Sequence, residues 1–369
     1  MHFPDLSQGH DSDRAFSEKL IRWQKQHGRH SLPWQKTRDP YRIWLSEIML
    51  QQTQVATVIP YYQRFLARFP DVATLASAPL QAVMELWSGL GYYSRARNLH
   101  LCAQRVFAEY RGIFPADPAL LEQLPGIGRS TAAAIAAFSC GVRAAILDGN
   151  VIRVFSRIFG IAEFSGGKPV KDALWRRAEA LLPVSEIESY TQGLMDLGAT
   201  ICTRSKPNCP SCPFASCCVA LASDRVEELP VRKPKKTLPE KRTAMLVIIH
   251  ENQVLLEQRP DFGVWGGLLS LPELAVQQDS AEEADQHALE LAAASYGIVQ
   301  SCRQLQSFVH VFSHFRLHVS PYRISISQRL KIAAQSKHVW YEFDRIDQAP
   351  LPSPVKKLLL GMANLASLD

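Results

Sequence analysis

Two acidic residues occupy positions at which a carboxyl group can do acid–base chemistry. Glu47 falls within residues 41–50, a stretch predicted to be helical, and its neighbours three and four residues away are mostly apolar. A carboxylic acid on an apolar face keeps its proton to higher pH than usual, so Glu47 could donate a proton near neutrality. The alternative interpretation is an ordinary surface glutamate with a nearby partner.

The second acidic residue, Asp148, lies in the sequence Leu147-Asp148-Gly149-Asn150, just before another predicted helix. Asp and Asn are both common helix N-caps, so either Asp148 or Asn150 could cap this helix, and a cap at Asn150 would leave Asp148 free. Cleavage of a glycosidic bond needs a proton for the leaving group and negative charge near a cationic sugar. Glu47 and Asp148 are suited to these tasks, although the sequence does not show that they meet.

A cluster of cysteines could hold a metal. Five of the eight cysteines lie between Cys202 and Cys218, and in a reducing compartment such a cluster indicates metal rather than disulfides. Four of them, Cys202, Cys209, Cys212 and Cys218, have the spacing C-x6-C-x2-C-x5-C, which suits four-fold sulfur ligation. Zinc and iron–sulfur centres both bind thiolates, and the spacing does not distinguish them. Cys217 could replace Cys218 as the fourth ligand.

A glycine-containing turn at residues 124–131 separates two predicted helices. Gly126 and Gly128 permit unusual backbone angles and leave N–H groups exposed at the start of the second helix. Such a turn can bind a phosphate group independently of the DNA sequence. An ordinary turn between two helices has the same composition, so the glycines alone do not decide the question.

The elements that must position these residues change in character along the chain. Up to about residue 200 apolar residues recur at helical spacing, and Pro and Gly interrupt them. Beyond residue 240, runs rich in β-branched residues predict strands. The helices predicted in the first part, besides 41–50, are 16–26, 55–68, 130–139, 151–159, 171–182 and 186–197. The second part is predicted to contain strands at 243–250, 254–257, 308–320 and 338–343 and helices at 281–293 and 353–362.

Length and composition set the overall class. The chain has 369 residues, of which 47% are hydrophobic and 21% charged, as expected for a globular protein with two domains. A proline run with basic residues at 230–236 predicts an extended linker. We therefore predict a multidomain protein with an all-α domain at 1–223, a linker at 224–240 and an α+β domain at 241–369.

The charge and the absence of long apolar runs bear on partners and location. The formal net charge of +6 is compatible with a polyanionic partner without requiring one. No apolar run approaches the roughly 20 residues of a membrane-spanning helix, and the acidic N-terminus does not resemble a secretory signal. We expect a protein without a membrane partner that acts as a monomer in the cytoplasm, associated with the nucleoid.

Three features occur together: a Leu-Pro-Gly-Ile-Gly turn with Asp148 downstream, the cysteine spacing and an all-helical domain. This combination resembles the endonuclease III superfamily of base-excision DNA glycosylases. Within it, the segments at 32–34, 44–54, 89–93 and 146–150 are similar to those of the MutY-type adenine DNA glycosylases. The resemblance covers nearly the whole chain. It implies a helix-hairpin-helix domain, a 4Fe-4S cluster on the four cysteines, and a duplex DNA substrate with adenine opposite 8-oxoguanine or guanine.

The resemblance also implies roles for individual residues. Glu47 would protonate adenine, at N7, and then help to activate water, while Asp148 would stabilise the cationic sugar. Asn150 would help to position water or the sugar. Gln51 and Tyr92 would enter the DNA beside the lesion pair, after the adenine has left the base stack.

One position separates the subfamilies. Bifunctional members carry a lysine where this chain has Ser130, in the hairpin that also contains Gly126 and Gly128. A serine hydroxyl cannot form the Schiff base that supports strand cleavage. We therefore expect a monofunctional enzyme, with the hairpin residues in contact with DNA.

The C-terminal domain resembles the Nudix (MutT-like) fold. Gly267 and Glu273 match the start of the Nudix motif, and Glu282 matches a later position. Where the motif requires a Glu pair for Mg²⁺, however, this chain has Asp285 and Gln286, so the carboxylate set is incomplete. We predict no pyrophosphatase activity.

The same domain is implied to recognise 8-oxoguanine through the segment Phe312-Ser313-His314. Phe312 would wedge beside the lesion, and Ser313 and His314 would hydrogen-bond to it. The alternative is a plain hairpin, because the apolar residues of this region also satisfy strand packing.

Two other functions remain open at this stage. One is a bifunctional pyrimidine glycosylase and AP lyase of the endonuclease III kind, against which Ser130 and the second domain argue. The other is a non-enzymatic iron–sulfur protein that binds DNA and senses damage, against which Glu47 and its surrounding motif argue.

Overall fold

The computed structural model describes residues 10–231, 237–260, 263–275, 286–312, 314–330 and 337–366. Contacts within the chain divide it into two compact units. The first contains Met1–Ser77 and Asn98–Lys235, and the second contains Ala78–Arg97 and Lys236–Asp369. A short segment of the predicted helical domain therefore belongs, by its contacts, with the C-terminal part of the chain.

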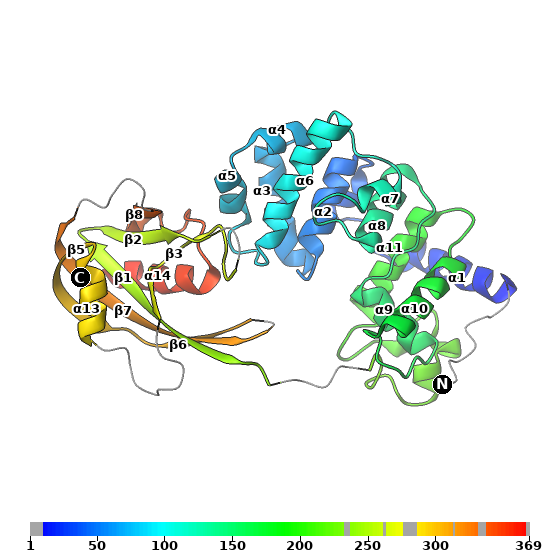
Figure 1. Cartoon of the computed structure of the whole chain (residues 1–369). Coiled ribbons are helices and arrows are strands. Elements are labelled where there is room, and N and C mark those ends of the chain that lie inside the picture. The colour runs from blue at the N-terminus through cyan, green and yellow to red at the C-terminus, as the bar shows by residue number, and fades with distance from the viewer. Residues whose placement is uncertain are drawn as a thin grey trace. The chain divides into compact units, whose positions relative to one another are not determined.

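The described part of the first unit is helical, as predicted, and each helix expected from the sequence is present (Figure 1). In chain order it contains α1 (His10–His27), η1 (Pro33–Lys36), α2 (Pro40–Leu50), α3 (Val55–Arg68), α4 (Val72–Ser77), the greater part of α6 (Ser94–Tyr110), α7 (Pro118–Leu121), α8 (Arg129–Cys140), α9 (Gly149–Ile158), α10 (Lys168–Ala180), α11 (Ile187–Asp196), a π-helix, η2 (Leu197–Ile201), η3 (Cys209–Ser211), η4 (Ala215–Cys217) and α12 (Val219–Ala222).

Helix α9 lies in the core of this unit. Its apolar residues recur three and four positions apart, so Val151, Val154, Phe155 and Ile158 fall on one buried face. They belong to a core cluster with apolar residues of α1, α10 and α11 and with the alanines of α8. Since alanine has a small side chain, α8 can approach its neighbours closely, which fixes the hairpin before α8 and the start of α9 in one body.

The second unit is a mixed sheet with helices (Figure 1). Its elements are α5 (Leu80–Trp87), the start of α6, β1 (Glu240–His250), β2 (Gln253–Gln258), β3 (Leu269–Ser270), β4 (Glu273–Ala275), α13 (Gln286–Ala294), β5 (Gly297–Gln304), β6 (Phe308–Val311), β7 (Arg316–Arg329), β8 (His338–Glu342), η5 (Phe343–Arg345) and α14 (Ser353–Ala366). The strand order is β3-β2-β1-β7-β5, with β4 on β1, β6 on β7 and β8 on β2.

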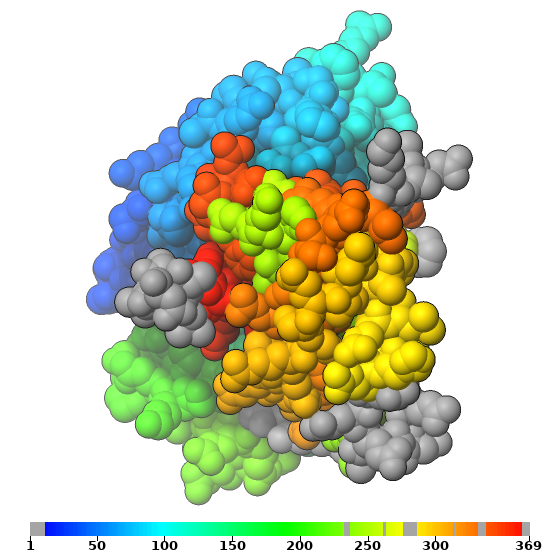
Figure 2. Space-filling view, turned by 90° about the vertical axis from the view of Figure 1, so that its left-hand side faces the viewer, coloured from blue at the N-terminus to red at the C-terminus, as the bar shows by residue number. Residues whose placement is uncertain are grey.

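Strand β1 runs through the centre of the sheet and pairs in parallel with β7. Residues 243–249 are buried without interruption, as expected for a strand covered on both faces. Leu246 and Ile248 share a core cluster with Leu289 and Ala293 of α13. Figure 2 shows α13, in yellow, against the neighbouring strand β5 on the surface of this unit.

The single strand predicted at 308–320 is wrong. The chain reverses within it, so that β6 and β7 pair antiparallel with Val311 opposite Arg316. The N–H of Phe312 donates to the carbonyl of Phe315 at 2.9 Å and closes the turn. Alternating apolar residues on both sides of the reversal explain why the sequence reads as one strand.

The predicted linker at 224–240 also differs from the structure. Residues 224–231 pack on the helical unit: Leu229 is buried, and its carbonyl accepts a hydrogen bond from Arg157 Nε at 2.9 Å. At the other end, Glu240 already belongs to β1. Among the described residues, no helix combines the length and apolar character needed to cross a membrane.

Candidate active site

Glu47 opens onto a pocket of about 530 Å³ in the helical unit. Helix α2, which carries it, begins at Pro40 after the N-cap Asp39, whose carboxylate accepts from Tyr41 N at 2.9 Å. The other walls come from α1, α8, α11 and the segment between α1 and α2. The volume lies within the range of pockets that enclose small organic molecules.

Burial raises the pKa of Glu47 to about 8, and the negative charge of Asp148 contributes to the increase. The two carboxyl groups therefore interact, which answers the question that the sequence left open. At pH 7 Glu47 holds its proton and can act as a general acid. Of the neighbours predicted to surround it on α2, Ile43 and Trp44 are buried and Leu50 is partly buried, which confirms the mostly apolar face.

Asp148 is the N-cap of α9, and its Oδ1 accepts from Val151 N at 2.8 Å. The alternative in which Asn150 caps this helix is therefore wrong. Burial raises the pKa of Asp148, while the helix N–H groups and the positive charge of Arg153 act in the opposite direction. Burial is the larger effect, and the donors partly offset it by stabilising the charged form of Asp148, the form that a cationic sugar would favour.

Asn150 lies two residues after Asp148, in the first turn of α9, and is held by an arginine. Arg153 donates to Asn150 Oδ1, to Gly198 O and to Cys202 O, each at 2.8 Å. A Cβ atom on Gly198 would lie 2.6 Å from Asn150 Cβ, so the π-helix η2 can approach α9 only with glycine at this position. Sequence reasoning missed Arg153, which links the start of α9 to the cysteine loop.

The hairpin at residues 124–131, before α8, has the backbone geometry expected if its N–H groups are to bind a phosphate. Gly126 has φ +79°, and Gly128 is the N-cap of α8. The Ser130 hydroxyl accepts from Leu147 N at 3.0 Å, which places it beside Asp148 along the chain. Gln51 Nε2 lies 3.5 Å from Gly126 O, so this predicted DNA-contacting residue is next to the hairpin.

Gly126→Ala should lower the stability of the helical unit by about 2 kcal/mol. The added Cβ would lie 2.9 Å from Asn98 Cβ, and the positive φ is unfavourable for alanine. Thermal unfolding would measure the change, with Gly128→Ala as the control because its Cβ meets nothing within 4 Å. Equal unfolding temperatures for the two variants would contradict the prediction.

The four predicted ligands Cys202, Cys209, Cys212 and Cys218 line one cavity, together with apolar residues of α9 and η2. Burial, with a smaller contribution from the other three thiols, raises the pKa of Cys212 to about 11. Buried thiols that repel one another as thiolates suit a site whose charge a bound cation offsets. Arg157 Nη1 also donates to Cys202 Sγ at 3.4 Å.

Two further observations bear on this cavity. Cys217 is exposed, and its thiol lies 3.5 Å from the Phe214 carbonyl. Cys218 therefore suits the role of fourth ligand better than Cys217 does. In the described part of the chain, no group of three or more His, Cys, Asp or Glu side chains is arranged to hold a single metal ion.

For the iron–sulfur cluster that the sequence resemblance implies at these cysteines, Arg157→Met should cause most of the protein to be purified without iron. The buried guanidinium donates to Thr203 O at 2.7 Å and to Leu229 O at 2.9 Å as well as to Cys202, so its loss frees both ends of the cysteine loop. The cost in stability should be about 3 kcal/mol. Iron and sulfide per chain would be measured, with the exposed Arg176→Met as control, and a full iron content would contradict the prediction.

Tyr92 belongs to the second unit and is exposed over 53% of its surface. Its φ of +49° follows Gly91 at +76°, so the turn at 89–93 holds this side chain outward. The Arg95 guanidinium lies 5.4 Å from the centre of its ring. An exposed aromatic ring on a constrained turn can stack against bases.

The turn between β6 and β7 contains the predicted recognition segment, of which Phe312 and His314 are described and Ser313 lies outside the described residues. Phe312 stacks on Phe315, with ring centres 4.5 Å apart, and also contacts Trp265 at 5.6 Å. His314 is exposed at the turn. Trp265, whose φ is +54°, was not predicted as part of this site from the sequence.

The Nudix-like motif is only partly described by the structure. Glu273 pairs with Arg259 at 2.8 Å. Gln286 begins α13, and the carboxylates at 282 and 285 lie outside the described residues. The lack of pyrophosphatase activity stays a prediction.

Comparison with known proteins agrees with both domains. Residues 45–180 match the model for "HhH-GPD superfamily base excision DNA repair protein", and residues 243–361 match that for "NUDIX domain". A thermostable thymine-DNA glycosylase is similar in structure, with a TM-score of 0.54 and 29% identity over 58% of this chain and all of that one. Endonuclease III in a DNA complex, at 22% identity and a TM-score of 0.51 over 59% of this chain and 98% of that one, shares the fold.

Relatives along the full chain are more informative. The adenine DNA glycosylase of Buchnera aphidicola (subsp. Acyrthosiphon pisum) is 37% identical over 345 residues, which are 93% of this chain and 96% of that protein. The adenine DNA glycosylase of Homo sapiens is 32% identical over 93% of this chain and 73% of its own length. Together with both domain matches, these similarities show that the chain belongs to the adenine DNA glycosylase family.

Proposed function

We propose that the protein is a monofunctional adenine DNA glycosylase, which removes adenine mispaired with 8-oxoguanine or guanine during base excision repair. One observation carries the proposal: a glutamic acid with a pKa of about 8 opens onto a base-sized pocket and is paired electrostatically with the carboxylate that caps α9. Family membership supplies the substrate class.

In the proposed reaction adenine leaves the duplex and enters the pocket. Glu47 donates its proton to N7, which makes the base a better leaving group, and the bond from N9 to the sugar breaks. Asp148 stabilises the positive charge that develops on the sugar. The Glu47 carboxylate then takes a proton from the attacking water, so that hydroxide adds to the sugar and Glu47 is again protonated. Asn150, oriented by Arg153, helps to place the water or sugar.

We further propose that Cys202, Cys209, Cys212 and Cys218 hold a 4Fe-4S cluster, since all four line one cavity. When bound, the cluster would cross-link the loop that follows η2. Arg153 and Arg157 of α9 already hydrogen-bond to this loop. The cluster would therefore fix the loop relative to the helix that begins at Asp148.

The DNA-contacting residues are also proposals. Gly126, Gly128 and Ser130 would lie on a backbone phosphate, as a helix N-terminus with exposed N–H groups favours. Gln51 and Tyr92 would enter the duplex. The segment Phe312-Ser313-His314 would read 8-oxoguanine, and its stacked aromatic rings support a role in base contact. We expect a monomer that acts in the cytoplasm on the nucleoid.

The test is incubation of the cluster-containing protein with a duplex that carries one adenine opposite 8-oxoguanine, followed by hot alkali. We expect cleavage of the adenine strand only after alkali, and no trapping by borohydride. Strand cleavage without alkali, with strong trapping, would instead indicate a lyase. No base release from the intact protein would leave a DNA-binding damage sensor as the better interpretation.

A further inference from the structure

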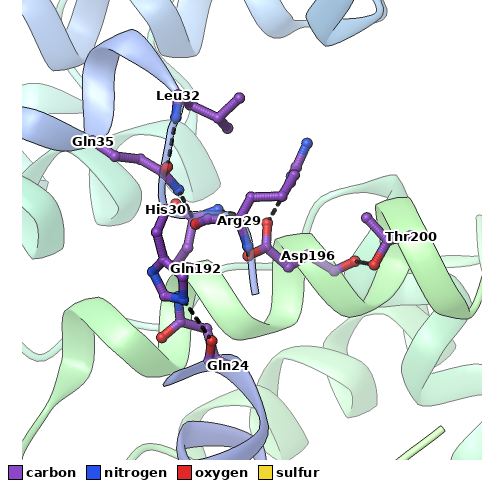
Figure 3. A network of polar contacts seen from close by, with 8 residues as sticks. All are labelled: Gln24, Arg29, His30, Leu32, Gln35, Gln192, Asp196 and Thr200. Atoms are coloured by element: carbon purple, nitrogen blue, oxygen red, sulfur yellow. Dashed lines mark hydrogen bonds and ion pairs between the residues drawn. The ribbon is translucent and has the colours of Figure 1, made fainter. Parts of the chain in front are cut away.

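The buried carboxylate of Asp196 has no part in the reaction outlined above, yet its hydrogen bonds lead to the wall of the Glu47 pocket. Asp196 is the last residue of α11, and its side chain is completely buried. Its two oxygens accept from Arg29 N at 2.8 Å, Arg29 Nε at 2.7 Å and Gln192 Nε2 at 2.8 Å. Arg29 and Gln192 both line the pocket, whereas Asp196 is not among its lining residues, and the polar network that joins the three is drawn in Figure 3.

The part of the pocket wall that Asp196 hydrogen-bonds to lies outside any helix or strand. Residues 28–32 have no helical or strand structure, so their position depends on specific contacts. The backbone at Gly28 packs between α1 and the carboxylate, because a Cβ atom there would lie 2.5 Å from Gln24 O and 2.9 Å from Asp196 Oδ2. Gln35 closes the segment by donating to Arg29 O at 2.8 Å and accepting from Leu32 N at 3.0 Å (Figure 3).

We propose that Asp196 is a positioning residue for base removal, which acts through Arg29 and Gln192 to fix the pocket wall on which the extruded base rests. This inference depends on the proposed function. A proton can pass from Glu47 to the base only at hydrogen-bond distance, so a small displacement of the base is costly. A misplacement of about 1 Å can slow a reaction about 10²-fold.

A purely structural role for Asp196 makes a different prediction, and the chain contains a matched control for it. Asp13 is also a buried aspartate paired with an arginine, with its Oδ1 2.7 Å from Arg177 Nη1. Neither residue of this pair lines the Glu47 pocket. Asp13→Asn and Asp196→Asn should therefore destabilise the helical unit in the same way, whereas only Asp196→Asn should disturb the pocket.

The experiment compares single-turnover rates of adenine release per active site, below the unfolding temperature of every variant. We expect Asp196→Asn to be about 10²-fold slower than the wild type, with duplex affinity unchanged within about twofold because the fully buried Asp196 carboxylate cannot reach the DNA backbone. Asp13→Asn should keep the wild-type rate. In an Arg29→Ala background, Asp196→Asn should cause little further loss, because the two residues act as one unit.

Gly28→Ala provides a second variant if Asp196→Asn does not fold. It retains both charges, and its methyl group would push the segment away from both Gln24 O and the carboxylate, so it should also slow base release at unchanged duplex affinity. A wild-type rate for Asp196→Asn or Gly28→Ala, or an equal loss in Asp13→Asn, would overturn the inference. Failure of the proposed function is a separate result, since the wild-type protein itself would then release no adenine.

Discussion

Replacing Glu47 with glutamine should slow adenine release from the mispaired duplex by about 10⁴-fold. The amide cannot donate the proton that the base requires, nor can it accept one from water. The shape of the side chain is retained, so duplex affinity should stay within about twofold of the wild-type value. Single-turnover base release and equilibrium duplex binding would measure the two quantities.

Glu188→Gln is the matched control. Glu188 lines the same pocket but is paired with Arg38 at 2.7 Å in a largely exposed ion pair, whose contribution is small. We expect its rate to stay close to that of the wild type. Equal losses in the two variants would show that any change of charge in the pocket, rather than the acid at Glu47, controls the rate.

The pH dependence follows from the same carboxyl group. The protonated form is the active one, so the wild-type rate should fall as pH rises through about 8, and Glu47→Gln should lose this dependence. Stability should behave similarly. The folded protein holds a proton that the unfolded chain releases near 4.5, so this group's contribution is lost as pH rises towards 8. The unfolding temperature of Glu47→Gln should increasingly exceed that of the wild type over this range.

Replacing Asp148 with asparagine should slow base release by about 10³-fold while leaving the fold intact. Asparagine caps a helix as well as aspartate does, so the hydrogen bond to Val151 N is retained and stability should change by less than about 0.5 kcal/mol. Only the negative charge beside the sugar is lost. Loss of this charge should also lower the pKa of Glu47, so the fall of the residual rate should move to lower pH.

Asp148→Ala separates the cap from the charge. It loses both, so it should be about 1 kcal/mol less stable than the wild type and as slow as Asp148→Asn. Thermal unfolding and single-turnover rates on the same preparations would compare them. A wild-type rate for Asp148→Asn, with a slow Asp148→Ala, would show that Asp148 serves only as the helix cap.

The helices were predictable because each is amphipathic and ends at a strong local marker. The hairpin before α8 and the start of α2 after Asp39 depend on Gly and Pro, whose backbone preferences are local. The reversal between β6 and β7 was missed because period-two alternation continues through it, and only pairing between strands distinguishes a hairpin from one long strand. The packing of residues 224–231 was missed for a similar reason, since a composition rich in Pro and charge does not show long-range contacts.

The residue types of the site could be predicted from the sequence, but the hydrogen bonds that link residues far apart in the chain could not. Glu47 and the cysteines could be named from their neighbours in sequence. Asp196 was overlooked because an acid at the end of an apolar helix usually faces solvent, and its partner Arg29 lies far away in the chain. The two arginines of α9 were missed because their targets are backbone carbonyls, which leave no pattern of residue types.

Helix α9 connects two parts of the protein. Asp148, whose position matters for the reaction, lies at its start, and the cysteine loop, whose thiols can be oxidised, is bonded to its end. Its ten residues span about 15 Å, from the carboxylate at its first turn to the arginine bonded to the cysteine loop at its last. A disturbance of that loop, such as oxidation of its thiols, would reach the reaction centre as a tilt of the helix. Oxidation of the loop would then also reduce the capacity of the protein to remove adenine.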